Sequence, residues 1–216
     1  MNLLVTGADG FVGGWLVRAL LAAGHSVTGT ARVGGGPSTV LSAAERDAIE
    51  WRELDLGSGP SVMAAARGRW DAVVHLAALS SGTEARRDPG LAWELNAAGT
   101  ARLVDALQNG DALLLHVSTG EVYGQGSEAP RREEDPVLPC SPYAASKAGG
   151  ELAVWEATRR SGLRAIVARP FPHTGPGQDT RFVIPALAER LRLARRIGAP
   201  AINTGNLEPV RDLLDV

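Results

Sequence analysis

A glycine turn near the N-terminus constrains the fold of this chain more than any other feature. It reads Thr-Gly-Ala-Asp-Gly-Phe-Val-Gly at residues 6–13, directly after the apolar run Leu3–Val5 and at the start of a segment with helical spacing. In this Gly-x-x-Gly-x-x-Gly spacing, Gly7 permits the tight turn, Gly10 lets the backbone approach a pyrophosphate, and Gly13 allows close helix–strand packing. Because the free N–H groups of a helix start attract phosphates, the turn predicts dinucleotide binding.

Strands and helices alternate along the first 168 residues. Such alternation implies right-handed crossovers and a parallel sheet covered on both faces. We therefore predict an α/β fold with a doubly wound parallel sheet. The expected strands are 3–5, 25–30, 49–54, 72–76, 112–117 and 163–168, and the expected helices are 11–23, 61–67, 89–108 and 143–160.

The sequence changes character after Arg169. Prolines and glycines crowd residues 170–177, which predicts a loop. A basic helix is expected at 182–196, followed by strand-like pieces at 201–203 and 210–216. Because the chain stops on an apolar strand without a polar tail, we expect it to be a fragment of a longer protein.

Composition excludes several classes of function. The 22 Lys and Arg residues nearly balance the 24 Asp and Glu residues, so the formal net charge is −2 and no basic excess attracts nucleic acid or a membrane. The single cysteine, Cys140, leaves no internal disulfide, and no cluster has metal-ligand spacing. No apolar run reaches the ~20 residues of a membrane span, and the N-terminus lacks the order of a signal peptide. We expect a cytoplasmic protein without nucleic-acid, membrane or metal partners.

The end of the second expected strand bears on which dinucleotide binds. An acidic residue there would hold the ribose hydroxyls of NAD, but residues 30–32 are Thr-Ala-Arg. Arg32 could bind the 2′-phosphate of NADP instead, or be a solvated surface side chain. Asp55, after the third strand, is a candidate for the adenine amino group and equally a turn residue. The pattern favours NADP(H), with NAD(H) possible.

The segment Ser-Pro-Tyr-Ala-Ala-Ser-Lys at residues 141–147 carries the predicted chemistry. Ser141 is a good N-cap and Pro142 a good first helical residue, so Tyr143 and Lys147 lie one turn apart on the same face. A neighbouring ammonium group is expected to lower the pKa of the phenol from its ordinary value of about 10. Such a tyrosine can exchange a proton with a substrate while a nicotinamide gives or takes hydride.

Two hydroxyl residues, Ser118 and Thr119, follow the fifth expected strand. Open α/β sheets bind ligands at this edge, so either hydroxyl could hydrogen-bond the reacting oxygen. A turn-capping pair is the alternative. Further along, Gly149 and Gly150 fall in the middle of an expected helix, where close packing against a neighbour would explain them.

Seven motifs run nearly from end to end: TGADGFVG at 6–13, HLAA at 75–78, NAAGT at 96–100, VSTGEVYG at 117–124, SPYAASK at 141–147, RPFPHTGPGQ at 169–178 and VRDLLDV at 210–216. Together they resemble the extended short-chain dehydrogenase/reductase family, in its nucleotide-sugar epimerase/dehydratase branch. The resemblance implies a Rossmann cofactor domain at 1–168 and the truncated start of a sugar-nucleotide domain at 169–216. It also implies a homodimer in which the helix from Tyr143 joins the interface.

The resemblance further implies the roles of individual residues. The expected catalytic set is Thr119, Tyr143 and Lys147, with Glu121 as a further candidate, and Lys147 also holds the nicotinamide ribose. The expected cofactor-binding residues are Gly7, Gly10, Phe11, Val12, Gly13, Arg32, Asp55, Leu56, Leu76, Ala77, Ala78, Asn96, Lys147 and Pro170. The expected substrate-binding residues are Ser118, His173, Arg181 and Arg211, the last of which matches an arginine that grips the diphosphate.

Within the branch, the motifs at 169–178 and 205–212 most resemble enzymes of GDP-sugars, which usually carry Asn where this chain has Pro172. Glu121 matches the acid/base glutamate of dehydratases, but Gly120 stands where those enzymes often have Asp or Ser. These features together favour a GDP-4-keto-6-deoxy-mannose 4-reductase. A nucleotide-sugar 4-epimerase, a GDP-mannose 4,6-dehydratase and, outside enzymes, a non-catalytic dinucleotide-binding module remain alternatives.

Overall fold

The protein is represented by a computed structural model that describes residues 1–35, 38–108, 110–125, 129–208 and 210–216. The chain divides into two compact units, Met1–Pro170 and Phe171–Val216. The sequence places this boundary two residues earlier, between 168 and 169. Each unit is described by itself.

The first unit is built on a six-stranded parallel sheet in the order β3-β2-β1-β4-β5-β6. The strand order reverses direction between β1 and β4, and ligands of such sheets bind outside the carboxyl ends of the strands at this reversal. The doubly wound α/β fold predicted from the sequence is confirmed. The strands are β1 (Asn2–Thr6), β2 (Ser26–Ala31), β3 (Glu50–Glu53), β4 (Ala72–His75), β5 (Leu113–Val117) and β6 (Ala165–Ala168).

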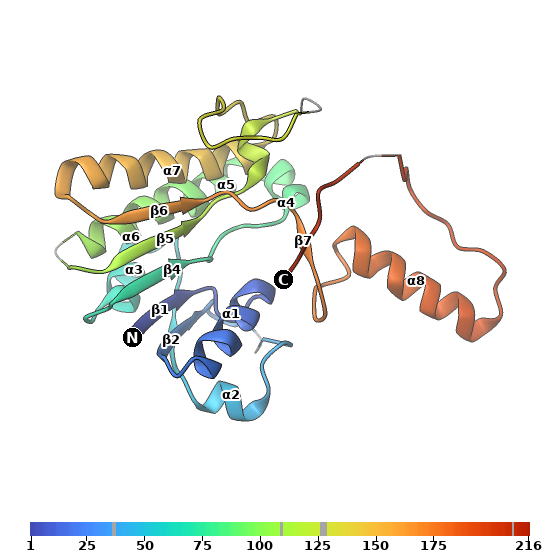
Figure 1. Cartoon of the computed structure of the whole chain (residues 1–216), viewed down its shortest axis with the longest axis horizontal. Helices are drawn as coiled ribbons and strands as arrows, with labels where there is room; N and C mark the ends of the chain where they lie inside the picture. The colour runs from blue at the N-terminus through green and yellow to red at the C-terminus, as the bar shows by residue number, and fades with distance from the viewer. Residues whose placement is uncertain (36–37, 109, 126–128, 209) are drawn as a thin grey trace. The chain divides into compact units, whose positions relative to one another are not determined.

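Helices cover both faces of this sheet, with α1 on one side and α6 and α7 on the other (Figure 1). Successive strand residues point to opposite faces, which divides the core in two. Leu4 and Val73 pack with α3, α6 and α7, whereas Val5 and Val74 pack with α1. The main helices of this unit are α1 (Phe11–Ala22), α3 (Gly59–Ala66), α5 (Pro89–Trp93), α6 (Gly99–Leu107) and α7 (Pro142–Ser161).

The helix expected at 89–108 is interrupted by a π-helical turn, η1 (Glu94–Ala98), between α5 and α6. A π turn inserts an extra residue into the helix and is common at functional sites. Here it directs Asn96 into the interior. Three short helices were not predicted from the sequence: α2 (Ala43–Asp47), α4 (Gly82–Arg87) and the 3₁₀-helix η2 (Gly120–Tyr123).

The second unit contains α8 (Val183–Ile197) and a short parallel pair, β7 (His173–Thr174) with β8 (Leu214–Asp215). The strand expected at 201–203 is absent from the described residues, and the one expected at 210–216 shortens to β8. The strand is short because, within the described part of the chain, its backbone pairs only with β7. The hydrogen bonds from Leu214 N to the Pro172 carbonyl at 2.9 Å and from Val216 N to the Thr174 carbonyl at 3.1 Å mark the two ends of this pairing.

Candidate active site

The glycine turn between β1 and α1 is packed against the end of β4. Gly7 has a φ of 70°, and a Cβ there would lie 2.9 Å from the backbone nitrogen of Ala77. A Cβ at Gly13 would lie 2.1 Å from the Gly7 carbonyl oxygen. Thr6 Oγ1 accepts hydrogen bonds from the backbone N–H groups of Leu76 and Ala77, both at 3.2 Å. Only glycine is therefore compatible with the turn at these two positions.

The start of α1 is open to an anion. Its N-cap residue is Gly10, and no side chain among the described residues caps it. Phe11 and Val12 form the first turn, whose N–H groups point towards the N-terminal end of the helix. Together with the helix dipole, this arrangement suits a phosphate group. The turn and the helix start thus fit the pyrophosphate of a dinucleotide.

Asp9 and Arg32 meet at the carboxyl end of β2. The backbone N–H of Arg32 donates to Asp9 Oδ2 at 3.3 Å, and a Cβ on Gly35 would lie 3.0 Å from the same oxygen. The Arg32 side chain is exposed and forms no ion pair with the part of the chain that the structure describes. Sequence reasoning missed Asp9, although a carboxylate inside the glycine turn was a signal that could have identified it.

The other predicted cofactor residues of the first unit lie on loops after the strands. Asp55 Oδ1 accepts a hydrogen bond from Gly57 N at 2.9 Å, so its carboxylate caps the turn after β3. Leu56 is buried against α6, where a Cβ on Gly99 would lie 2.8 Å from its own Cβ. The carbonyl of Pro170 accepts from Gly120 N at 2.8 Å. Leu76, Ala77 and Ala78 follow β4 and are partly buried.

Asn96 acts inside the protein. Its Oδ1 accepts from Leu79 N at 2.8 Å, and its Nδ2 donates to the Leu79 carbonyl at 3.1 Å and to Ser146 Oγ at 2.9 Å. Ser146 Oγ in turn donates to the carbonyl of Tyr143 at 2.8 Å. Any influence of Asn96 on a cofactor is thus exerted by tying the loop after β4 to α7.

Two glycines of α7 allow this helix to pack closely against α5 and η1. A Cβ at Gly149 would lie 2.5 Å from the Trp93 ring, and one at Gly150 would lie 2.8 Å from the Asn96 carbonyl oxygen. The close approach expected from the Gly149–Gly150 pair is therefore present.

α7 carries Tyr143 in its first turn and Lys147 one turn later. Ser141 caps the helix by accepting a hydrogen bond from Ala144 N at 3.1 Å, with Pro142 as first helical residue. Lys147 is the only lysine in the chain, and it is 3% exposed. Burial lowers the pKa of Lys147 to about 8, and the charge of Glu151 acts in the opposite direction.

The pKa of Tyr143 differs from the expectation. It is raised to about 12, first by burial and then by the negative charge of Glu121, while a hydrogen bond with Thr119 acts to lower it. The prediction that Lys147 brings this pKa below 10 is therefore wrong for the protein's own residues, because desolvation of the phenolate dominates. The phenol is protonated at neutral pH, which is the form that donates a proton.

The side chains of Ser118 and Thr119, which follow β5, have different hydrogen-bond partners. Thr119 Oγ1 accepts from Glu121 N at 3.2 Å, and its hydroxyl acts to lower the pKa of the Tyr143 phenol. Ser118 is buried, and its Oγ donates to the carboxylate of Glu151. The structure thus brings Thr119, Glu121 and Tyr143 together and directs the Ser118 hydroxyl into the interior.

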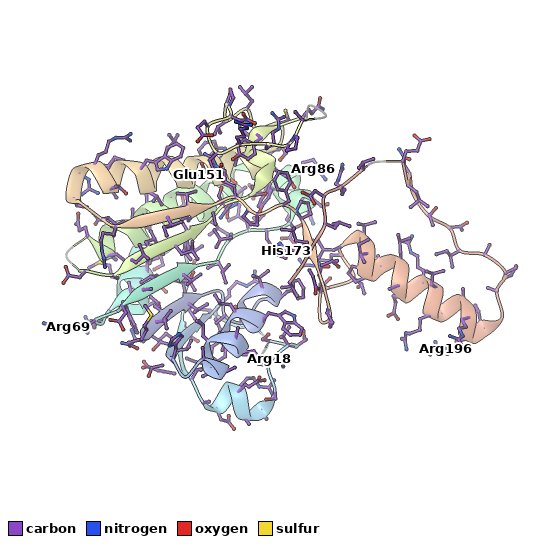
Figure 2. The ribbon with its side chains drawn as sticks, in the orientation of Figure 1. Arg18, Arg69, Arg86, Glu151, His173 and Arg196 are labelled. Atoms are coloured by element: carbon purple, nitrogen blue, oxygen red, sulfur yellow. The ribbon has the colours of Figure 1, made fainter. Side chains whose placement is uncertain are left out.

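Glu151 is a residue that sequence reasoning missed. It is fully buried, and Arg169 holds both of its oxygens, with Nε 3.0 Å from Oε1 and Nη2 2.7 Å from Oε2. Arg169 Nη1 also donates to the Tyr123 hydroxyl at 3.0 Å. Figure 2 labels Glu151 on α7. The available signal was its position four residues after Lys147, on the same helix face.

The three predicted substrate residues of the second unit are each engaged locally. His173 lies in β7, and Arg181 forms an ion pair with Asp179 at 3.2 Å. Arg211 is exposed and donates to the neighbouring Val210 carbonyl at 3.1 Å. Among the described residues, no group of three or more His, Cys, Asp or Glu side chains could hold a metal ion. None of the described helices is both long and apolar enough to cross a membrane.

The fold and the site define a class: a Rossmann-type dinucleotide-binding protein with a glycine turn after β1 and a Tyr-x-x-x-Lys sequence at the start of α7. Comparison with known proteins assigns the family, since the model of the NAD dependent epimerase/dehydratase family matches residues 3–216. The chain therefore belongs to this family of NAD(P)-dependent epimerases, dehydratases and reductases of nucleotide sugars, as the resemblance implied.

Individual relatives span several activities. The chain is 36% identical to the GDP-6-deoxy-D-mannose reductase of Pseudomonas aeruginosa, over all of this chain and 66% of the reductase. The structure of RMD from the same organism, complexed with NADPH, is 34% identical with a TM-score of 0.77, over 99% of this chain and 68% of that one. The NAD-bound dTDP-glucose 4,6-dehydratase DesIV from Streptomyces venezuelae is 30% identical with a TM-score of 0.80, over 90% and 63%. The chain thus spans about two thirds of the length of these relatives.

Proposed function

We propose that this chain is the cofactor-binding and catalytic part of an NADPH-dependent reductase whose substrate is GDP-4-keto-6-deoxy-mannose. The observation that carries the proposal is the 36% identity, over all of this chain, to a GDP-6-deoxy-D-mannose reductase. Reduction of a ketone needs a proton donor, and the Tyr143 phenol, whose pKa burial raises to about 12, is in the protonated form that such a step requires. The structural similarity to RMD from Pseudomonas aeruginosa, at a TM-score of 0.77, supports the same class of reaction.

The cofactor is held by the residues at the reversal of the sheet. Gly7, Gly10 and Gly13 admit the pyrophosphate to the start of α1, and Arg32 binds the 2′-phosphate of NADPH by charge-assisted hydrogen bonds. The P. aeruginosa relative, which carries NADPH, supports this choice. Asp9 favours the alternative, NAD, because a carboxylate at the end of β2 accepts hydrogen bonds from ribose hydroxyls and repels a phosphate.

Thr119, Tyr143 and Lys147 orient the substrate carbonyl, donate the proton and stabilise the charge that develops. A bound nicotinamide would supply the hydride. Thr119 donates a hydrogen bond to the substrate carbonyl oxygen and orients it, and the Tyr143 hydroxyl delivers a proton to that same oxygen as negative charge develops on it. Lys147 holds the nicotinamide ribose and stabilises the phenolate that proton transfer leaves behind. Arg181, Arg211 and His173 bind the sugar nucleotide.

A 4,6-dehydratase is the second candidate. The observation in its favour is that the charge of Glu121 acts on Tyr143, so the carboxylate lies near the place where a dehydratase needs a second acid/base group. Gly120, between Thr119 and Glu121, supplies no side chain to assist it. We therefore rank reduction above dehydration. A non-catalytic module is disfavoured by the intact Tyr143–Lys147 pair.

The protein is also proposed to form a homodimer through α7. The outer face of this helix carries Leu152, 61% exposed, and Trp155, 36% exposed, which line an open hollow together with Glu156, Arg159 and Arg160. Two such faces, related by a twofold axis, would cover these apolar side chains. The cellular location is proposed to be the cytoplasm.

Product analysis in two reactions tests the proposed function. With GDP-4-keto-6-deoxy-mannose and NADPH, the protein should oxidise NADPH in a 1:1 ratio to sugar reduced, and Glu121→Gln should leave the rate nearly unchanged. With GDP-mannose and only catalytic cofactor, no 4-keto-6-deoxy product should accumulate. Accumulation of that product, abolished by Glu121→Gln, would replace the reductase with a dehydratase.

A further inference from the structure

We propose that Glu151 is a positioning residue, held by Arg169 and Ser118, whose carboxylate keeps the ammonium group of Lys147 charged at the dinucleotide site. The proposal deepens the proposed function, because it supplies the counter-charge on which the catalytic lysine depends. Its test is independent of any substrate.

Lys147 needs such a counter-charge because it is buried without a partner of its own. Its ammonium group forms no hydrogen bond or ion pair with any residue that the structure describes, and its residue exposure is 3%. A buried ammonium group without compensation loses its proton, since a low-dielectric environment disfavours the charged form. A neutral amine at this place could neither stabilise a phenolate nor hold its charge beside the cofactor.

The groups around Lys147 leave one source of negative charge in the interior. His75 on β4 and His116 on β5 feel the charge of Lys147, but burial lowers the pKa of His75 to about 3 and that of His116 further, so both rings are neutral. Glu121 on η2 is exposed and acts on Tyr143. Among the described residues, Glu151 is the only buried acid, and it follows Lys147 by one turn on α7.

The carboxylate of Glu151 is held from several directions. Arg169 binds both oxygens at 3.0 and 2.7 Å, and the buried Ser118 hydroxyl donates a further hydrogen bond. Arg169 is itself fixed, because its Nη1 donates to the Tyr123 hydroxyl at 3.0 Å and its guanidinium stacks 5.0 Å from the centre of the Tyr123 ring. These contacts hold the Glu151 carboxylate in the interior and prevent its side chain from rotating out to solvent.

The charges of Lys147, Glu151 and Arg169 distinguish a counter-charge for Lys147 from a purely structural Glu151–Arg169 ion pair. Glu151 and Arg169 alone would form a neutral pair, but Lys147 adds a second cation, so the three groups together carry one positive charge. Removal of the carboxylate would leave two cations buried near each other. Removal of the guanidinium breaks the same ion pair but leaves the carboxylate for Lys147. The two changes therefore affect Lys147 differently, although both disturb the same contacts.

The experiment is an NMR titration of protein labelled with ¹³C at lysine Cε. Because Lys147 is the only lysine, the spectrum reports this residue alone. In Glu151→Gln, which keeps the size of the side chain, the pKa of Lys147 should fall by about one unit relative to the unmodified protein. It should not fall in Arg169→Gln, and Glu151→Asp should restore most of the original value. The alkaline limb of the pH–rate profile should shift with the titration.

Two results would overturn the proposal. One is an unchanged Lys147 titration in Glu151→Gln, and the other is an equal fall in Glu151→Gln and Arg169→Gln, which would mark Glu151 as structural only. If Glu151→Gln does not fold, Arg169→Gln and Glu151→Asp still decide, since a clear fall of the pKa in Arg169→Gln contradicts the proposal and an unchanged or raised pKa supports it. A failure of the proposed substrate would leave all of these titrations unaffected.

Discussion

The two units of this chain differ in how their functional residues are supported. In Met1–Pro170, the glycine turn, Tyr143 and Lys147 lie on elements that share a buried two-faced core. In Phe171–Val216, Ala194 is the one described residue that is buried, and α8 exposes Leu191 and Ile197. Figure 2 labels Arg196 on the same helix. The comparison teaches that the first unit is preorganised by its own packing, whereas the second unit presents its arginines on elements with little core of their own.

The largest expected effect is chemical and belongs to the first unit. Tyr143→Phe removes the proton donor but keeps the ring that packs beside α4 and α5, so turnover should fall by ~10² to 10⁴-fold. Cofactor affinity, measured by fluorescence titration with NADPH, should change little. Loss of turnover together with loss of cofactor binding would show that Tyr143 supports the site rather than the reaction.

A stability comparison tests the difference in core directly. Leu103→Ala in α6 truncates a residue that is 1% exposed and should cost about 2–5 kcal/mol of unfolding free energy. The same change at Leu191 in α8, which is 57% exposed, should stay within about 0.5 kcal/mol. Chemical denaturation monitored by circular dichroism measures both. Equal losses would mean that α8 is buried in solution.

Two arginine variants, one in each unit, distinguish cofactor binding from binding of the sugar nucleotide. Arg32→Ala removes a charge-assisted contact and should weaken NADPH binding by about ten- to a hundredfold while leaving NADH binding nearly unaffected. Arg211→Ala should leave the affinity for both cofactors unchanged and raise the KM for the sugar nucleotide. If Arg32→Ala weakens both cofactors equally, Arg32 makes no 2′-phosphate contact and Asp9 dominates the ribose site.

The smallest effect concerns pH. Because the pKa of Lys147 is lowered to about 8, its charge is lost as pH rises through that value, and turnover should fall about fivefold between pH 8 and 9. Stability should move the other way: the unfolded lysine binds a proton up to its ordinary pKa of about 10.4, so the unfolded state holds more protons and the folded state gains stability as pH rises from 8 towards 10. Parallel rate and thermal-melting profiles check both signs.

The sequence was sufficient for the sheet and for the placement of the turn and of α7, because those depend on local patterns. The glycine spacing defines the β1–α1 turn, and Ser141 with Pro142 defines the start of α7. Such signals are carried by adjacent residues and do not depend on tertiary contacts.

What the sequence could not supply depends on burial and on partners distant in the chain. The spacing of Glu151 from Lys147 is visible in the sequence, but the burial of Glu151 follows only once Arg169, 18 residues later, is placed beside it. The raised pKa of Tyr143 comes from burial and from the charge of Glu121. Neither can be derived from the motif at residues 141–147 alone. The π turn at Asn96 likewise depends on Leu79 and Ser146, 17 and 50 residues away.

The protonation state of Tyr143 tests the central claim most directly. The chain has two tyrosines, so protein labelled with ¹³C at tyrosine Cζ gives two signals, and Tyr143→Phe identifies the one of interest. If Tyr143 is the proton donor of a reductase, its signal should stay at the position of a neutral phenol from pH 6 through about 10 and titrate only towards about 12. A phenolate signal at neutral pH would contradict the account and indicate the base that epimerisation or dehydration requires.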